Sequence, residues 1–529
     1  MRASSLLVFV SLSAVAQPMV LEGALPETGP DFVLIPFQVP AGTVEVEVRH
    51  PVQQSENILD YGLSDPRGFR GWGGGNVEPI VVGELAASRS YLARPIEAGT
   101  WNVVIGKAKV VSAPARYRLE VELRTIATLA PQPDRAQTAW TPGAALETTT
   151  RWYAGDLHVH SRESGDAAPT LDAIATFARG RGLDFVELSD HNTVSQLDFM
   201  TAAQARHPAL LFVPGVEFTT YAGHLNGIGA TRTVDHRFGV EGATFDAAVA
   251  AFVEQKAVLS INHPVLDLGQ LCIGCAWRQK LPATSIGAVE IGTGGWDKTG
   301  VLFGAQALAF WDRQLAQGSH AAAVGGSDDH SGGRATGTFD SPIGNPTTMV
   351  FAKLLSVDAV VTAIREGRTV VKLQGPDDPM VELTAGDARI GDTVRSGQAT
   401  LQATVTGGRG KTLKLLENGV AKETVEVTDD PFVFTRLVTS PPSGESRWRG
   451  EVWVDEAPRT VSSHLWFTQP EPMKTGCGCA GFDAAPLLVG LALLLLVPRP
   501  PRGDKATSGV LRAFLSRRQY QTPPRRRSI

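Results

Sequence analysis

Residues 185–191, Phe-Val-Glu-Leu-Ser-Asp-His, carry the pattern that decides the fold of the central part of this 529-residue chain. A short apolar strand ends at Leu188, and an acid and a histidine, Asp190 and His191, follow it. The same order recurs after three further apolar strands, which lead to Glu217, to His263, and to Asp328 with His330. In β/α barrels the catalytic groups collect at the carboxyl ends of the strands. These placements therefore predict one active site at a single edge of the sheet.

Short apolar strands alternate with helical stretches on both sides of this segment. Further strands are expected at 210–213, 258–261 and 321–324. Helical spacing of apolar residues predicts helices at 171–181, 245–256 and 303–317. Thr170 and Thr244 stand where helix N-caps belong. Alternation on this scale predicts parallel β/α architecture, either open or closed into a barrel.

The length of the chain predicts about three domains, at a soft prior of roughly 100–200 residues each. Strict alternation of apolar and polar residues, as in Val44–Arg49, predicts strands with one wet face and a β-sandwich at 25–148. The β/α region spans 151–375. The pattern returns to β at 376–469, where Asn418-Gly419 is a strong hairpin signal, and we expect an immunoglobulin-like sandwich there. The formal net charge of -5 argues against a nucleic-acid surface, which needs a basic patch.

Residues 1–16 have the features of a secretory signal peptide. Arg2 precedes a mostly apolar stretch, and Ala14-Val15-Ala16 is a cleavage pattern. The alternative is a buried N-terminal strand. Export exposes Cys272 and Cys275 to an oxidising compartment, which favours a small disulfide loop; a structural zinc site is the weaker alternative, because a second ligand pair is missing.

The segment 473–529 resembles the MYXO-CTERM sorting signal of surface proteins. Cys477-Gly478-Cys479 precedes an uncharged apolar stretch, Ala484–Val497, and arginines follow. At 14 residues the stretch is short against the ~20 that a membrane span needs. The chain continues to Ile529, whereas the family's chains end soon after the arginines. The resemblance implies a sorting protease as partner and display on the cell envelope, with possible membrane anchoring through this segment.

Gly155-Asp156-Leu157-His158-Val159-His160-Ser161 predicts a metal centre. Two histidines at positions i and i+2 of an extended segment point to the same side. Neutral imidazole is the commonest protein metal ligand. The pair alone is a weak signal, but with the downstream Asp328-x-His330 and a carboxylate at Glu217 it becomes strong.

These motifs resemble the PHP (polymerase and histidinol phosphatase) family of metallohydrolases. The resemblance is carried by GDLHVHS at 155–161, SDHN at 189–192, GVE at 215–217, NHP at 262–264 and GGSDDH at 325–330. Gly223-His224-Leu225-Asn226 after Glu217 points to the branch that includes carbaryl hydrolase. The resemblance implies a distorted seven-stranded β/α barrel flanked here by the two sandwiches, with two or three divalent metal ions, for which Zn, Mn and Fe all suit the mixed ligands.

The resemblance also implies a ligand set. His158, His160 and Asp328 would hold one metal; Glu217 would bridge to a second, completed by His224 and His263; Asp166, His191 and His330 would hold a third. Some family members have histidine at the place of Asp166, so the oxygen ligand in this chain leaves the identity of the third metal open. Asp190 either ligates or orients a histidine, and Asp156 likewise is a candidate for the outer shell. His191, Asp328 and His330 are the candidates for proton transfer.

Closely spaced divalent metals lower the pKa of a bound water and stabilise charge on the reacting group, so the sequence predicts a hydrolase of a small molecule. A phosphoester is the first choice of substrate, with Arg278, Lys280 and Arg334 as candidates to hold an anion. Hydrolysis of a carbamate, ester or amide is the alternative, with Trp277 and Trp296 as candidates for an apolar pocket. A third hypothesis is a surface-binding protein with a vestigial metal site.

Overall fold

The computed structural model describes residues 17–50, 56–269, 272–294, 299–334 and 341–471. The predicted signal peptide at 1–16, the predicted sorting segment at 473–529 and Trp296 lie outside these ranges, so the hypotheses that rest on them stay predictions. Within the described ranges, no helix has both the length and the apolar character that crossing a membrane requires.

The N-terminal region consists of two four-stranded antiparallel sheets around one apolar core. One sheet has the order β1 (Met19–Leu25), β8 (Ala115–Arg124), β3 (Glu45–Arg49), β6 (Ile80–Gly83); the other has the order β2 (Phe32–Val39), β7 (Gly99–Lys109), β4 (Ile58–Asp65), β5 (Gly68–Gly74). Sequence alternation predicted a wet face on β3, but Glu45 and Glu47 are both buried. The guanidinium of Arg124, on the neighbouring strand β8, pairs with both carboxylates and so compensates their burial.

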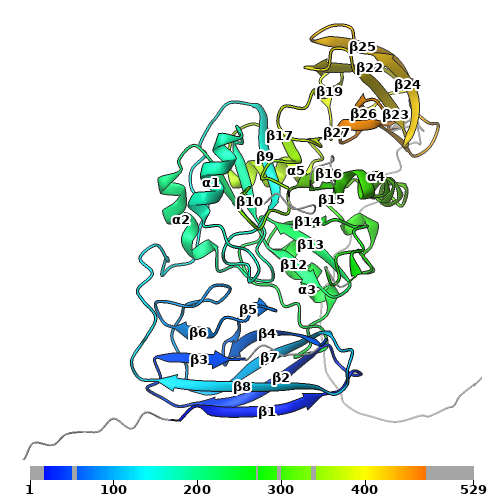
Figure 1. Cartoon of the computed structure of the whole chain (residues 1–529). Helices are drawn as coiled ribbons and strands as arrows, with labels where there is room; N and C mark the ends of the chain where they lie inside the picture. The colour runs from blue at the N-terminus through cyan, green and yellow to red at the C-terminus, as the bar shows by residue number, and fades with distance from the viewer. Residues whose placement is uncertain (1–16, 51–55, 270–271, 295–298, 335–340, 472–529) are drawn as a thin grey trace, which may run out of the picture. The chain divides into compact units, whose positions relative to one another are not determined.

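The central region alternates strands and helices, as the sequence predicts (Figure 1). Its elements are β9 (Arg151–Val159), α1 (Leu171–Gly180), β10 (Phe185–Leu188), α2 (Leu197–Arg206), β11 (Leu211–Pro214), β12 (Glu217–Thr220), β13 (Gly223–Ile228), α3 (Phe245–Glu254), β14 (Val258–Ile261), η2 (Ala283–Ser285), β15 (Ala288–Thr293), α4 (Thr299–Ala316), β16 (Ala322–Gly326), β17 (Thr347–Ala352), α5 (Val357–Arg365) and β18 (Thr369–Lys372). Thr170 and Thr244 cap α1 and α3, each accepting a hydrogen bond from a backbone N–H of the first turn. Both predicted N-caps are confirmed.

The closed seven-stranded barrel expected from the resemblance is not seen. The strands of the central region belong to two sheets, one with the order β11-β10-β9-β17-β18 and one with the order β12-β13-β14-β15-β16. Two isolated bridges, Val159 to Asp329 and His191 to Glu217, join the two sheets. The chain leaves β11 through Pro214-Gly215 and enters the antiparallel hairpin β12–β13, so the parallel ladder stops there. The two bridges lie beside the predicted site.

The C-terminal region forms one further sheet and adds strands to the central sheet that contains β18. Its strands are β19 (Met380–Ala385), β20 (Ala388–Arg389), β21 (Thr393–Arg395), β22 (Gln398–Thr406), β23 (Thr412–Glu417), β24 (Val420–Glu426), β25 (Phe432–Thr439), β26 (Glu445–Val454), β27 (Ala457–Ser462) and β28 (Leu465–Thr468). Asn418 and Gly419, with φ of 52° and 82°, join β23 to β24 as the predicted hairpin.

One C-terminal sheet continues the central sheet. Strand β18 pairs antiparallel with β27, with Val370 opposite Ser462. The predicted boundary at 375/376 therefore separates strands that share one hydrogen-bonded sheet, and the domain limits stay predictions.

Candidate metal centre

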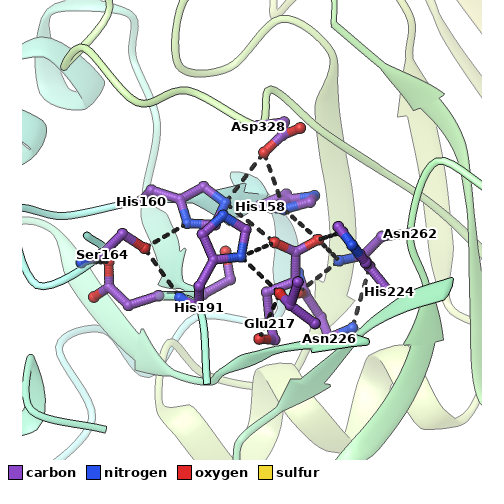
Figure 2. A network of polar contacts seen from close by, with 12 residues as sticks. His158, His160, Ser164, His191, Glu217, His224, Asn226, Asn262 and Asp328 are labelled. Carbon is purple, nitrogen blue, oxygen red and sulfur yellow. Dashed lines mark hydrogen bonds and ion pairs between the residues drawn. The ribbon is translucent and has the colours of Figure 1, made fainter. Parts of the chain in front are cut away.

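Strand ends of both central sheets deliver the predicted ligands to one place. His158 lies on β9 and His160 directly after it; His191 follows β10; Glu217 begins β12; His224 lies on β13; His263 follows β14; Asp328 and His330 follow β16. Figure 2 shows the labelled side chains of this set pointing toward one another around the carboxylate of Glu217. The structure brings these residues together, and their roles as ligands remain a proposal.

Glu217 is the centre of the cluster. Its Oε1 lies 3.2 Å from Nδ1 of His224 and 3.2 Å from Nε2 of His263. Its Oε2 lies 2.8 Å from Nδ1 of His191. The side chain is 1% exposed, so a charged carboxylate is held away from water among imidazoles. This is the position that a bridging ligand needs.

A first group consists of His158, His160, Glu217 and Asp328, whose ligand atoms all lie within 4.8 Å of one another. Oδ1 of Asp328 is 3.2 Å from Nε2 of His158 and 3.1 Å from Nε2 of His160. Asp328 has φ of 56°, a left-handed backbone region that is uncommon outside glycine and recurs at functional sites. The strand before it comes very close to β9: a Cβ on Gly326 would lie 2.2 Å from Cβ of His158, so glycine is required there.

A second group consists of His160, His191 and His330. The His160 ring stacks on both others, with centroid distances of 4.4 Å to His191 and 4.1 Å to His330. Asp166 borders this group, with Oδ2 3.4 Å from Nε2 of His191 and 3.6 Å from Nε2 of His330. Asp166 thus lies where the resemblance places an oxygen ligand.

His224 and His263 form a third group with Cys275. The sulfur of Cys275 is bonded to Cys272, which confirms the predicted disulfide and occupies that donor atom. The backbone carbonyl of Cys275 accepts a hydrogen bond of 3.1 Å from Nδ1 of His263. This leaves Nε2 of His263 to face Glu217.

Asp156 and Asp190 do not face the histidine rings. Asp156 accepts backbone N–H groups of His158, Ser327 and Gly344, and thereby fixes the β9 segment against the end of β16. Asp190 accepts two hydrogen bonds from Ser161 and one from the backbone N–H of Ser164. Burial raises the pKa of Asp156 to about 6 and that of Asp190 to about 7. Of the two alternatives for Asp190, the geometry favours the positioning role.

Several residues beyond the predicted set hold the histidines in place. Nδ1 of His160 lies 3.0 Å from the hydroxyl of Ser164, and Nδ1 of His158 lies 3.2 Å from Oε1 of Glu290. Asn262 donates to Oε1 of Glu217 at 3.0 Å. Glu290 is buried on β15, in the run Ala-Val-Glu-Ile-Gly. The sequence analysis missed Glu290; an acid inside an apolar strand is the signal that could have found it.

Mutual attraction inside the cluster offsets the cost of burial. Burial raises the pKa of Glu217, but His158, His191 and His224 lower it more, so the pKa lies well below its usual range. Burial lowers the pKa of His158, but Asp328, Glu217 and Glu290 raise it well above 6.5. Burial lowers the pKa of His160 to about 3, helped by His330 and His191. The cluster thus combines an ionised carboxylate with histidines whose pKa values move in opposite directions, because a positive charge on one imidazole lowers the pKa of its neighbours.

The donor set fits divalent cations. Nε2 of His224 is buried without a hydrogen-bond partner among the described residues, although its Nδ1 faces Glu217. A buried unpaired nitrogen is costly unless something binds it. Imidazole nitrogens combined with carboxylate oxygens suit Zn, Mn and Fe. The residues therefore fit divalent metal ions in general, and the identity and number of the ions stay predictions.

A cavity of about 620 Å³ opens beside the cluster. Asp166, His191 and His224 are part of its lining. The predicted anion-binding residues Arg278, Lys280 and Arg334 are exposed and are not among the lining residues, and Arg278 pairs with Asp267 at 2.9 Å. Trp277 is absent from the same lining; it packs against Gly223 instead.

Neither protein-family models nor curated protein sequences match the chain. Solved structures with some likeness include a two-domain Bacteroides vulgatus protein containing a predicted PHP-like metal-dependent phosphoesterase, with 19% identity, 62% of this chain and 99% of that chain covered, and a TM-score of 0.35. An amidohydrolase from Chromobacterium violaceum has 18% identity, covers 35% of this chain and 93% of its own, and has a TM-score of 0.24. A CARDB domain from Pyrococcus furiosus has 17% identity, covers 17% and 94%, and has a TM-score of 0.13. Similarity at this level supports no argument about function.

Proposed function

We propose that this protein is a metal-dependent hydrolase of small molecules and that a phosphoester is the bond it cleaves. The observation that carries the proposal is the position of Glu217, one buried carboxylate that faces His191, His224 and His263 at 2.8–3.2 Å and reaches the His158–Asp328 group at 3.4 Å. Such convergence of ionisable groups in a protein interior is costly unless they serve a site. Divalent ions held there would lower the pKa of a bound water and neutralise charge on the reacting group.

The chain's own residues would divide the work. His158, His160 and Asp328 would hold one ion, His224 and His263 would hold another, and the carboxylate of Glu217 would be available to both. His191 and His330 lie at the more open side, 21% and 31% exposed, beside Asp166. They are the histidines placed to meet substrate, to hold a third ion or to pass a proton to the leaving group.

A second candidate function is hydrolysis of a carbamate, carboxylic ester or amide. The observation that favours it is the cavity lining, which among the described residues contains neither lysine nor arginine. A second anionic group on the substrate would find no lysine or arginine among these lining residues. A phosphoester remains the first proposal because a site with closely spaced divalent ions would suit in-line displacement at phosphorus.

The proposal is tested by the variant His160→Ala, measured for metal content and for turnover of chromogenic phosphate and carboxyl esters. We expect both to collapse, since His160 belongs to two of the three groups. His207→Ala is the matched control, because His207 contacts Asp172 outside the cluster. Wild-type metal content and turnover in His160→Ala would refute the assignment. Competitive inhibition by inorganic phosphate at millimolar concentration or below would support the phosphoester over the second candidate.

Export and display on the cell envelope, with processing near both ends, are part of the proposal and rest on the sequence alone. Mass spectrometry of envelope protein should find a mature N-terminus near Gln17. Intact chain confined to the cytoplasm would contradict export.

A further inference from the structure

The cavity beside the metal centre has two walls from distant parts of the sequence. Half of its lining residues belong to the central region, including His191, Tyr221 and His224. The other half come from the N-terminal sandwich, from β4, β5, β7 and the Gly75–Val77 segment after β5. The N-terminal region is thus part of the site and not only an appendage to it.

Polar contacts hold the N-terminal wall against the central region. The hydroxyl of Tyr221 donates a 2.8 Å hydrogen bond to Oδ2 of Asp60. Ser90 donates from its hydroxyl to the carbonyl of Glu163 at 2.7 Å and from its backbone N–H to the Glu163 carboxylate at 3.2 Å. The hydroxyl of Thr193 donates back to the carbonyl of Ser90. These groups are buried or half-buried, so their loss would leave polar atoms unsatisfied.

The two walls also meet through backbone and aromatic rings. A Cβ on Gly165, next to Asp166, would lie 2.3 Å from the carbonyl oxygen of Gly73, so only glycine permits this approach. Phe32 of β2 stacks on Tyr221 with ring centroids 5.6 Å apart. The position of the N-terminal wall is therefore fixed at the edge of the metal centre.

The chemistry of the N-terminal wall is mainly apolar. Ile58, Trp72, Val77 and Ala108 line it, and Gly73–Gly75 present backbone without side chains. Its polar side chains are Asp60, already engaged by Tyr221, and Asn76, whose Oδ1 accepts the backbone N–H of Glu78. A volume of about 620 Å³ lies within the range of small-molecule pockets, roughly 300–1,000 Å³. Such a wall favours an uncharged ring or chain and disfavours a second anion.

We propose that the N-terminal sandwich determines which substrates the active site accepts. Its side of the cavity binds the uncharged, apolar, ring-sized part of the substrate. This inference rests on the proposed function and narrows its substrate class to esters with a neutral aryl or alicyclic substituent. Phosphoesters with a second charged group, such as nucleotides, are excluded from that class.

The test uses Val77→Glu in the full chain. Val77 is 57% exposed, so the substitution adds a charge to the cavity lining without opening the core. Leu85→Glu is the matched control, because Leu85 is 64% exposed in the same region but is not part of the lining. Ligand-observed NMR measures the affinity of the chelator-treated protein for 1-naphthol. This measurement tests the N-terminal wall of the cavity without bound metal.

We expect Val77→Glu to weaken 1-naphthol binding by about tenfold, because a carboxylate in an apolar wall must be partly desolvated. Leu85→Glu should bind as the wild type does. In the metal-loaded protein, the ratio of kcat/KM for naphthyl over methyl esters of the same reacting group should fall by a similar factor. Unchanged naphthol binding in Val77→Glu, or an equal fall for both esters, would overturn the inference. Failure of the proposed function would be seen in a different result. Hydrolysis would then survive in His160→Ala or be absent from the metal-loaded wild type.

Discussion

Oε1 of Glu290 lies 3.2 Å from Nδ1 of His158, and Oε2 of the same carboxylate accepts the backbone N–H of His263 at 2.7 Å. One buried acid on β15 therefore orients a histidine of the first group and fixes the backbone of a histidine of the third. A carboxylate that receives the outer N–H of a metal-binding histidine sets its tautomer and ring orientation.

Replacing Glu290 with glutamine should weaken metal binding without unfolding the chain. The amide keeps the size of the side chain but removes the charge that orients His158, and loss of such an outer partner typically costs about 10- to 100-fold in metal affinity. Competition against a chromogenic chelator measures the affinity. Glu254→Gln, 70% exposed on α3, is the control and should leave it unchanged. Wild-type affinity in Glu290→Gln would show that the contact has no positioning role.

Replacing Glu217 with glutamine should lower metal affinity further. Glu217 belongs to the first group and contacts His191 of the second group and His224 and His263 of the third. We expect a loss of metal affinity greater than about 100-fold, since the change removes the shared charge itself rather than an outer partner. Elemental analysis after gel filtration should find less than one ion per chain. Retention of the full wild-type complement would exclude Glu217 as a bridge.

The disulfide Cys272–Cys275 should support His263. Replacing both cysteines with serine frees the segment whose carbonyl holds Nδ1 of His263 at 3.1 Å. Such a short loop stabilises the chain by at most about 2 kcal/mol in the loop-entropy model, so the fold should persist. We expect the affinity for one class of bound metal to fall about tenfold in a chelator titration, while the affinity for the rest stays unchanged. Equal weakening of all bound metal would point to a general loss of structure instead.

His236 should make the protein sensitive to acid. Its ring is 1% exposed, packs against Phe32, Phe69 and Trp72, and has no hydrogen-bond partner at either nitrogen among the described residues. Burial lowers its pKa from 6.5 to about 3, with the carboxylate of Asp235 opposing and the guanidinium of Arg237 assisting. The folded state excludes a proton that the unfolded chain accepts, so stability is present above pH 6.5 and is lost as the pH falls toward 3.

The variant His236→Phe isolates this effect. The wild type should lose up to about 1.4 kcal/mol more per pH unit than the variant between pH 6 and 4. Urea unfolding at several pH values measures both, and any packing strain from the larger ring is the same at each pH. Parallel stability curves for the two proteins would contradict the assignment.

Local patterns in the sequence predicted the elements of the central region and the histidines that meet there. The strands at 185–188 and 258–261 have the predicted limits, because short apolar runs bounded by polar turns are specified locally. Strand order is not local. The hairpin β12–β13 and the division into two sheets depend on pairings between distant segments, so periodicity predicted the strands but not the open ladder.

Partner residues were harder to predict than ligands. Glu290 and Ser164 act through contacts with His158 and His160 that no spacing encodes, and Glu45 and Glu47 are buried because Arg124 pairs with them from another strand. The N-terminal wall of the cavity is separate in sequence from the ligands, since even Ala108 precedes His158 by 50 residues, beyond the reach of any motif.

The pairing of β18 with β27 has a consequence for how the chain loses its structure. A protein cut after residue 375 would leave the carbonyl of Thr369 and the backbone N–H of Leu373 without the partners that Ser463 and Arg459 provide. An exposed sheet edge of this kind recruits other chains and promotes aggregation. The C-terminal strands therefore cover the edge of the sheet that contains β9 and β18. We expect heat to unfold the two regions in one cooperative transition rather than in two.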